Sequence, residues 1–205
     1  MDTERFFSMP FVAIASPKGQ PDKKQRVAIY NYKNPRAELS SDKYDLTCPL
    51  CGERMSVRQP IGVVAHFWHP EGCVGGEGES IEHEVGKDAI RNFLLKAEPY
   101  KGANIDFEYW LADVRRRADV YVRLPDGGVE VHEMQLAPIT PDELKERTND
   151  YFSAGVNDVH WWLGGNADND RNRQWCRDNL GYVDIAEIKR VDQSKIQHTY
   201  TANIN

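Results

Sequence analysis

Three acidic residues occupy positions at which a carboxylate is unexpected, because each lies on the side of its predicted element that should face the protein interior. They are Glu82, Asp119 and Glu133. A buried carboxylate costs free energy unless a positive charge meets it, and converging carboxylates repel one another unless divalent cations bind between them. Magnesium held by such acids can activate a water molecule and stabilise charge on a scissile phosphate. The three acids therefore predict magnesium-dependent cleavage of phosphodiester bonds.

Alternation along two predicted strands places two of these acids on one side of a hairpin. Asp119 shares its face with Tyr121, and Glu133 shares its face with Gln135. Across the hairpin, Asp119 and Glu133 can face the same helix, and we expect this helix to be the one that carries Glu82. The sequence therefore predicts one site to which a helix and two strands contribute.

Glu108 adds a fourth acid on the preceding strand, where it shares its face with Asp106 and Trp110. We expect Glu82 and Glu108 to assist metal binding directly or through water. A salt bridge between Glu82 and a buried arginine is the alternative to a metal site at that position.

The elements that position these acids follow from hydrophobic periodicity and turn signals. Apolar residues spaced for one helix face predict a helix over 81–97, and Ser80 is a suitable N-cap. Thr140 begins a capping box at the start of a second helix. A hairpin is predicted over 9–33. The core order is α-β-β-β-α-β, over residues 81–97, 105–111, 117–124, 129–136, 140–155 and 156–163.

Three of the four cysteines and two histidines cluster between residues 48 and 73. The thiolates of Cys48 and Cys51 are two residues apart on a turn and can bind one tetrahedral zinc ion. His66 and His69 have opposite parity on an extended strand, so we expect His69 and Cys73 to complete the site, with His66 as an alternative ligand. A closed set of four ligands predicts a structural zinc ion. Free cysteines packed in a small core are the alternative.

The charge pattern leaves room for a nucleic-acid ligand. A net charge of −6 argues against a protein that coats nucleic acid by bulk electrostatics, but Arg115, Arg116 and Arg117 form a local basic track. Arg147 and Tyr151 lie four residues apart on the second predicted helix and share a face. They are candidates for phosphate contact or for support of the metal site. The alternative makes Tyr151 a core residue and Arg147 a surface charge.

The order of these motifs resembles the competence protein CoiA-like family over residues 48 to 164. The matching residues are Cys48, Cys51, His66, His69, Glu79, Ser80, His83, Lys87, Arg117, Asp119, Glu133, Gln135, Arg147, Tyr151 and Trp161. The resemblance implies an N-terminal β-rich zinc-binding module and an α/β core of the PD-(D/E)XK restriction-endonuclease-like type. The predicted element order agrees with such a core.

The resemblance also implies roles for individual residues. Asp119 and Glu133 would be the metal-binding pair, and Gln135 would stand where the wider nuclease superfamily usually has lysine. Glutamine can orient a water molecule but supplies no charge, and Lys87 is the candidate for the missing positive charge. A departure follows Gln135, because Leu136-Ala137-Pro138 stands where the family often has serine. This departure weakens inferences about substrate handling.

We therefore expect a deoxyribonuclease that depends on magnesium or manganese and acts in DNA uptake, recombination, phage biology or defence. The alternative is a catalytically inactive nuclease fold that binds DNA or a protein, and the intact acid pair favours the enzyme. No apolar run approaches the roughly 18 residues of a membrane helix, so a cytoplasmic location without a membrane partner is expected. A homodimer or a protein partner remains open. The predicted parts are a hairpin and zinc-knuckle module over 1–76, a nuclease-like core over 77–165 and a C-terminal extension over 166–205.

Overall fold

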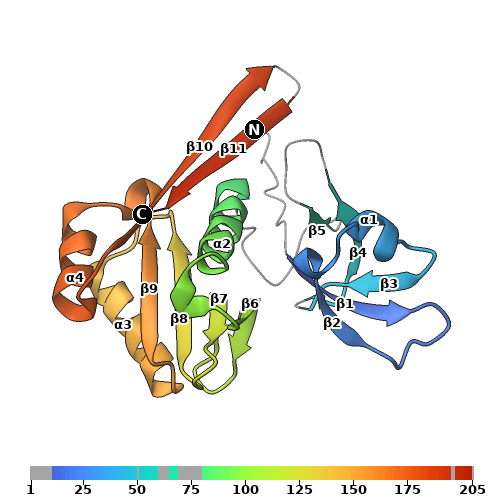
Figure 1. Cartoon of the computed structure of the whole chain (residues 1–205), viewed down its shortest axis with the longest axis horizontal. Helices are drawn as coiled ribbons and strands as arrows, with labels where there is room; N and C mark the ends of the chain where they lie inside the picture. The colour runs from blue at the N-terminus through green and yellow to red at the C-terminus, as the bar shows by residue number, and fades with distance from the viewer. Residues whose placement is uncertain (1–10, 50, 60–64, 69–79, 195–196, 205) are drawn as a thin grey trace. The chain divides into compact units, whose positions relative to one another are not determined.

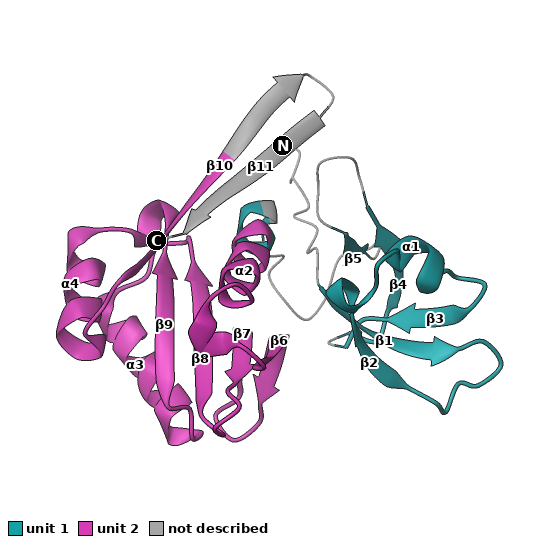
Figure 2. Cartoon of the chain, viewed as in Figure 1, with its two compact units in different colours: residues 1–84, 191–199 teal, residues 85–190, 200–205 magenta. Residues whose placement is uncertain are grey.

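The computed structural model describes residues 11–49, 51–59, 65–68, 80–194 and 197–204 (Figure 1). The chain divides into two compact units (Figure 2). The first comprises residues 1–84 and 191–199, and the second comprises residues 85–190 and 200–205. The domain boundaries expected from the sequence, at 76/77 and 165/166, stay predictions.

The first unit is built on a five-stranded sheet in the order β2-β1-β3-β4-β5. All of its strand pairs are antiparallel. The pairing of β1 with β2 confirms the predicted N-terminal hairpin. A short helix, α1 (Pro35–Glu38), begins after Asn34, whose side chain accepts a hydrogen bond from the N–H of Ala37. The strands are β1 (Val12–Pro17), β2 (Gln25–Ala28), β3 (Tyr44–Thr47), β4 (Arg54–Arg58) and β5 (His66–Trp68).

The second unit contains most of a six-stranded sheet in the order β11-β10-β9-β8-β7-β6, and one end each of β10 and β11 is assigned to the first unit (Figure 1). Strands β6 to β8 pair antiparallel, whereas β9 runs parallel to both β8 and β10. The mixed α/β architecture is therefore as expected. The strands are β6 (Asn104–Leu111), β7 (Arg116–Arg123), β8 (Val129–Gln135), β9 (Asp158–Leu163), β10 (Asp184–Ser194) and β11 (Gln197–Ile204).

Helices α2 (Ile81–Leu94) and α3 (Pro141–Ser153) occupy the predicted places along the chain, and α4 (Asp170–Leu180) follows β9. The order α2-β6-β7-β8-α3-β9 confirms the α-β-β-β-α-β prediction. Both bonds of the capping box between Thr140 and Glu143 are present, and they fix the start of α3. No helix in the described part of the chain is long and apolar enough to cross a membrane.

Helices α2 and α3 lie on opposite faces of this sheet. On α2, a Cβ added to Gly86 would lie only 2.5 Å from the Sδ of Met134. On α3, Tyr151 hydrogen-bonds to the neighbouring residue Glu133. Because adjacent residues of a strand point to opposite faces, Met134 faces α2 and Glu133 faces α3.

The inward side of α2 differs in part from the predicted apolar face. Ile90 and Leu94 are fully buried as expected, but Phe93 is 44% exposed. Lys87, which the hydrophobic pattern did not place inside, is fully buried. A buried ammonium group requires a partner, and its partner lies on β6.

Candidate active site

Asp119 and Glu133 lie opposite each other on the neighbouring strands β7 and β8. Val120 pairs with His132 in this register, so the next positions along the hairpin are Asp119 and Glu133. Both side chains are buried. The N–H of Asp119 donates to Oε1 of Glu133 at 3.2 Å, and the N–H of Met134 donates to Oδ2 of Asp119 at 2.9 Å. Each carboxylate therefore accepts a backbone N–H from the opposing strand.

Two side chains of α3 bind the Glu133 carboxylate from the helix side. The hydroxyl of Tyr151 donates to Oε1 at 2.7 Å, and the guanidinium of Arg147 donates to Oε2. Arg147 also lies over the ring of Trp161, with its guanidinium carbon 4.8 Å from the ring centroid. The two residues are four apart on one helix, so one helix face supplies both donors. These contacts favour support of the acidic pair as the role of Arg147 and Tyr151.

Gln135 belongs to the same hydrogen-bond network. Its Oε1 accepts from Arg147 at 3.3 Å, and its Nε2 donates to the carbonyl of Ala137 at 2.9 Å. Arg147 thus bridges Glu133 and Gln135, which are two residues apart on one face of β8. The positive charge next to this glutamine comes from Arg147.

The groups around Glu133 do not fully stabilise the charged form of its carboxylate. Burial raises its pKa, and the negative charge of Asp119 raises it further. The guanidinium of Arg147, the hydroxyl of Tyr151 and the N–H of Asp119 lower it, but the net result is a pKa of about 7, well above the usual 4.5. An added cation between the two carboxylates would lower the pKa of Glu133 by favouring its charged form.

A second acid–base pair joins α2 to β6. Nζ of Lys87 lies 3.2 Å from Oε1 of Glu108, and both side chains are buried. Glu108 has a left-handed backbone conformation, with φ of 52°, which interrupts the alternation of β6. Trp110 is 55% exposed, whereas Glu108 is buried. This conformation breaks the regular alternation from which a shared face of Glu108, Asp106 and Trp110 was predicted, and the shared face stays a prediction.

The expected direction of Glu133 toward α2 is wrong. Glu133 faces α3, because the adjacent residue Met134 packs against Gly86 of α2. Glu82 is half-buried in the first turn of α2, and this turn is assigned to the other unit. Its role in the site stays a prediction.

The basic track before Asp119 is less uniform than the sequence indicated. Arg115 is exposed at the turn before β7. Arg116 forms ion pairs with Asp150 at 2.7 Å and Glu146 at 3.1 Å. Arg117 is half-buried on β7, opposite Trp110. Among these three, Arg116 has much of its charge compensated by acids of α3.

The predicted zinc knuckle forms a tight turn in the first unit. The N–H of Gly52 donates to the carbonyl of Cys48 at 2.9 Å, and this turn carries the thiols of Cys48 and Cys51. His66 is buried on β5. The thiol and imidazole groups suit zinc, so a structural zinc ion stays a prediction. Two other predicted ligands lie outside the described residues: His69 and Cys73.

The structure also brings together three residues that sequence reasoning missed. Glu130 and His132 on β8 lie next to His160 on β9, with one possible ligand atom from each within 4.8 Å of the others. A signal was present, since an acid and a histidine two residues apart share a strand face. The neighbouring strand that supplies the third residue could not be paired with β8 from the sequence alone.

One comparison with known proteins found a match. A family model described as "Competence protein CoiA, nuclease-like domain" matches residues 79–195, which is more than half of the chain. The matched range includes Asp119, Glu133, Gln135 and Arg147. No curated protein and no solved structure matches the chain.

Proposed function

The chain belongs to the competence protein CoiA nuclease-like domain family, and we propose that it is a metal-dependent nuclease that hydrolyses phosphodiester bonds of DNA. The observation that carries this proposal is the buried pair of Asp119 and Glu133 on adjacent strands, with Arg147 and Gln135 beside it. We assign the second unit to the PD-(D/E)XK type, because its element order presents two acids on neighbouring central strands. Nucleic acid is then the substrate class.

The donor atoms fit a hard divalent cation. Asp119 and Glu133 offer carboxylate oxygens, which are the ligands that magnesium and manganese prefer. The raised pKa of Glu133 indicates negative charge that the protein itself does not fully compensate. When bound, such an ion would lower the pKa of a coordinated water and neutralise charge on the phosphate. We propose Asp119 and Glu133 as its protein ligands.

Neighbouring side chains would then orient the substrate and the attacking water. The amide of Gln135 can hold a water molecule by hydrogen bonds. Arg147 is partly exposed, and its planar guanidinium suits a phosphate oxygen. We therefore assign to Arg147 the positive charge next to Gln135. Lys87 forms a buried ion pair with Glu108 of β6. Glu108 stands opposite Asp119 in the register of β6 and β7, and a part for Lys87 in orienting water stays a prediction.

A zinc ion in the first unit completes the proposal. Cys48 and Cys51 would supply two thiolates, and two further ligands would come from His66, His69 and Cys73. A zinc ion held by four protein ligands would stabilise the fold of that unit. A cytoplasmic location also stays a prediction.

One observation favours a second candidate function, a nuclease fold that binds DNA or a protein without cutting. Both oxygens of Glu133 already accept hydrogen bonds, and Arg147 takes the position next to Oε2. In an active enzyme the cation must share Glu133 with Arg147 or displace it. In an inactive relative, Arg147 would replace the cation.

Cleavage assays on the full chain separate the two functions. Supercoiled, linear and single-stranded DNA are each incubated with magnesium, manganese or a chelator. We expect metal-dependent cleavage that Asp119→Ala reduces by about a hundredfold or more, because several kcal/mol of transition-state stabilisation depend on the ion. Asp178→Asn, an exposed acid on α4, is the matched control and should cut like wild type. Absence of cleavage on all three DNA forms with either metal would favour the binding module.

A further inference from the structure

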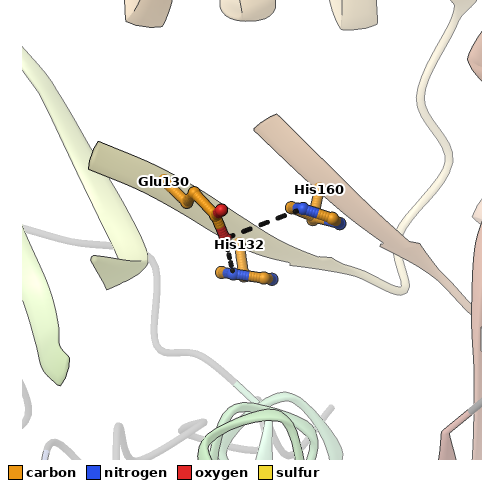
Figure 3. A group of neighbouring side chains, drawn as sticks. All are labelled: Glu130, His132 and His160. Atoms are coloured by element: carbon orange, nitrogen blue, oxygen red, sulfur yellow. Dashed lines mark ion pairs between the residues drawn. The ribbon is translucent and has the colours of Figure 1, made fainter. Parts of the chain in front are cut away.

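Glu130, His132 and His160 form a cluster on the face of the sheet opposite to Glu133. Glu130 and His132 share one face of β8, whereas Val131 and Glu133 share the other. His132 pairs with His160 in the parallel register of β8 and β9. Figure 3 shows the three side chains directed toward one another. The cluster is therefore separate from the proposed catalytic pair.

The distances within the cluster resemble those between ligands of one metal ion. Oε2 of Glu130 lies 3.5 Å from Nε2 of His132 and 3.9 Å from Nε2 of His160 (Figure 3). A tetrahedral zinc ion with bonds of about 2.1 Å keeps its ligand atoms about 3.4 Å apart. The two separations from Glu130 need only a small contraction to reach this value, and all three ligand atoms lie within 4.8 Å of one another.

Two of the three ligand atoms lack hydrogen-bond partners although they are buried. They are Oε2 of Glu130 and Nε2 of His132. The side chain of His132 is only 1% exposed, and its contact with Glu130 at 3.5 Å is at the limit of a hydrogen bond. Buried polar atoms are nearly always paired, and a metal ion between these two atoms would satisfy both of them.

The surroundings of His160 direct it toward the same space. Its Nδ1 lies 2.9 Å from Oδ2 of Asp184 on β10, which leaves Nε2 on the side of Glu130. A carboxylate on the far nitrogen is the usual support of a metal-binding histidine. Asp158 offers a fourth oxygen, because its Oδ2 lies 3.8 Å from Nε2 of His160 while Tyr182 binds its Oδ1.

We propose that Glu130, His132 and His160 form a binding site for a divalent transition-metal ion, with zinc as the best match and Asp158 as the fourth ligand. Two imidazole nitrogens and carboxylate oxygens favour zinc over magnesium. The ion joins β8 to β9, and through Asp184 it supports β10. The site is distinct from the cysteine cluster in the first unit and from the magnesium site proposed at Asp119 and Glu133.

Binding requires two local changes, and both can be observed. Nε1–H of Trp162 donates to Nδ1 of His132 at 3.2 Å, so neutral His132 carries its hydrogen on Nε2. Coordination through Nε2 moves this hydrogen to Nδ1 and breaks the bond from Trp162. The two imidazole rings, now stacked with centroids 4.3 Å apart, must also tilt toward the ion. The indole N–H of Trp162 therefore reports occupancy.

The test uses the full chain, stripped of metal with a chelator and titrated with zinc or cobalt. We expect the Trp162 indole N–H resonance, assigned with Trp162→Phe, to shift on zinc addition. Cobalt at this site should add d–d absorption that Glu130→Gln removes, whereas thiolate-to-metal charge transfer reports binding at the cysteine site and should be the same in wild type and Glu130→Gln. Glu130→Gln and His160→Asn should each lower affinity at least about tenfold, as should Asp184→Asn, which keeps all the ligands.

Controls keep the proposal open to refutation. Glu187→Gln changes an exposed acid on the same strand as Asp184 and should bind zinc like wild type. Trp162→Phe removes the donor that holds His132 in the non-binding tautomer, so it should bind zinc at least as tightly as wild type. An indole resonance that stays unshifted at saturating zinc overturns the proposal. Wild-type affinity in both Glu130→Gln and His160→Asn overturns it too.

Discussion

Glu133 is the residue whose observed contacts bear most directly on the proposed chemistry. It accepts hydrogen bonds from β7 and from two side chains of α3, yet its pKa remains raised by burial and by Asp119. These contacts fix its position, and the residual charge makes a cation favourable. Such a balance of positioning and electrostatic strain is typical of functional sites.

The substitution Asp119→Asn tests the repulsion between Asp119 and Glu133, because this repulsion should affect the free energy of unfolding. Glu133 has a folded-state pKa raised from 4.5 to about 7, so its contribution to stability is present below the unfolded pKa and is lost as pH rises through 7. Removing the Asp119 charge lowers the pKa of Glu133. Without metal, the free energy of unfolding of the variant should therefore exceed that of wild type by on the order of 1 kcal/mol at about pH 8.5. This gain in stability should fade at about pH 5.

Thermal unfolding of both proteins, with and without magnesium, checks the result. Magnesium should stabilise wild type and leave Asp119→Asn unchanged, because the variant lacks one of the two proposed ligands. A gain that is the same at both pH values would contradict the assigned repulsion between the two acids.

At the scale of elements, the sequence was most informative where a local pattern decides the structure. The capping box at Thr140 and the periodicity of α2 identified these helices, and hairpin signals identified β6 to β8. Regular alternation is interrupted at Glu108, because this residue has a positive φ. Burial of Lys87 was missed since its partner lies 21 residues away on β6. Local periodicity does not report ion pairs between residues that are far apart in the sequence.

The network around Glu133 was predictable only in part. Its acids and Arg147 could be named from the sequence, since Arg147 and Tyr151 share a helix face. Which helix faces Glu133 depended on the packing of Met134 against Gly86, and no local signal reports that contact. The cluster of Glu130, His132 and His160 required the register between β8 and β9.

Close packing of α2 on β8 predicts the effect of Gly86→Ala. The new methyl group would lie 2.5 Å from Sδ and 2.8 Å from Cγ of Met134, which is buried. Overpacking of this kind costs about 1–3 kcal/mol, and the better helix propensity of alanine returns at most about 1 kcal/mol. We therefore expect net destabilisation in denaturant titrations.

A double-mutant cycle identifies Met134 as the cause. Combining Gly86→Ala with Met134→Val shortens the opposing side chain, so the double variant should be more stable than the sum of the two single losses indicates. Additive losses would show that Met134 is not what the new methyl group meets.

The charge of the whole molecule limits how it can bind DNA. With a net charge of −6, the protein as a whole repels a polyanion, so binding must rely on a few local phosphate contacts. The arginines near Asp119 are the nearest source of positive charge, but they are not equivalent. Arg115 is exposed, whereas Arg116 is paired with Glu146 and Asp150.

We therefore expect Arg115→Ala to weaken DNA binding more than Arg116→Ala does. Each phosphate contact contributes about 0.9 to the slope of log K against log salt, so Arg115→Ala should reduce that slope by about 1. Arg116 is already neutralised by Glu146 and Asp150, so Arg116→Ala should change the slope by less than Arg115→Ala does. Binding is measured over a range of salt concentrations with Asp119→Ala as background, so that no DNA is cut. Arg177→Ala, an exposed arginine on α4, serves as the control. Equal losses from Arg115→Ala and Arg177→Ala would show that DNA does not approach through the turn before β7.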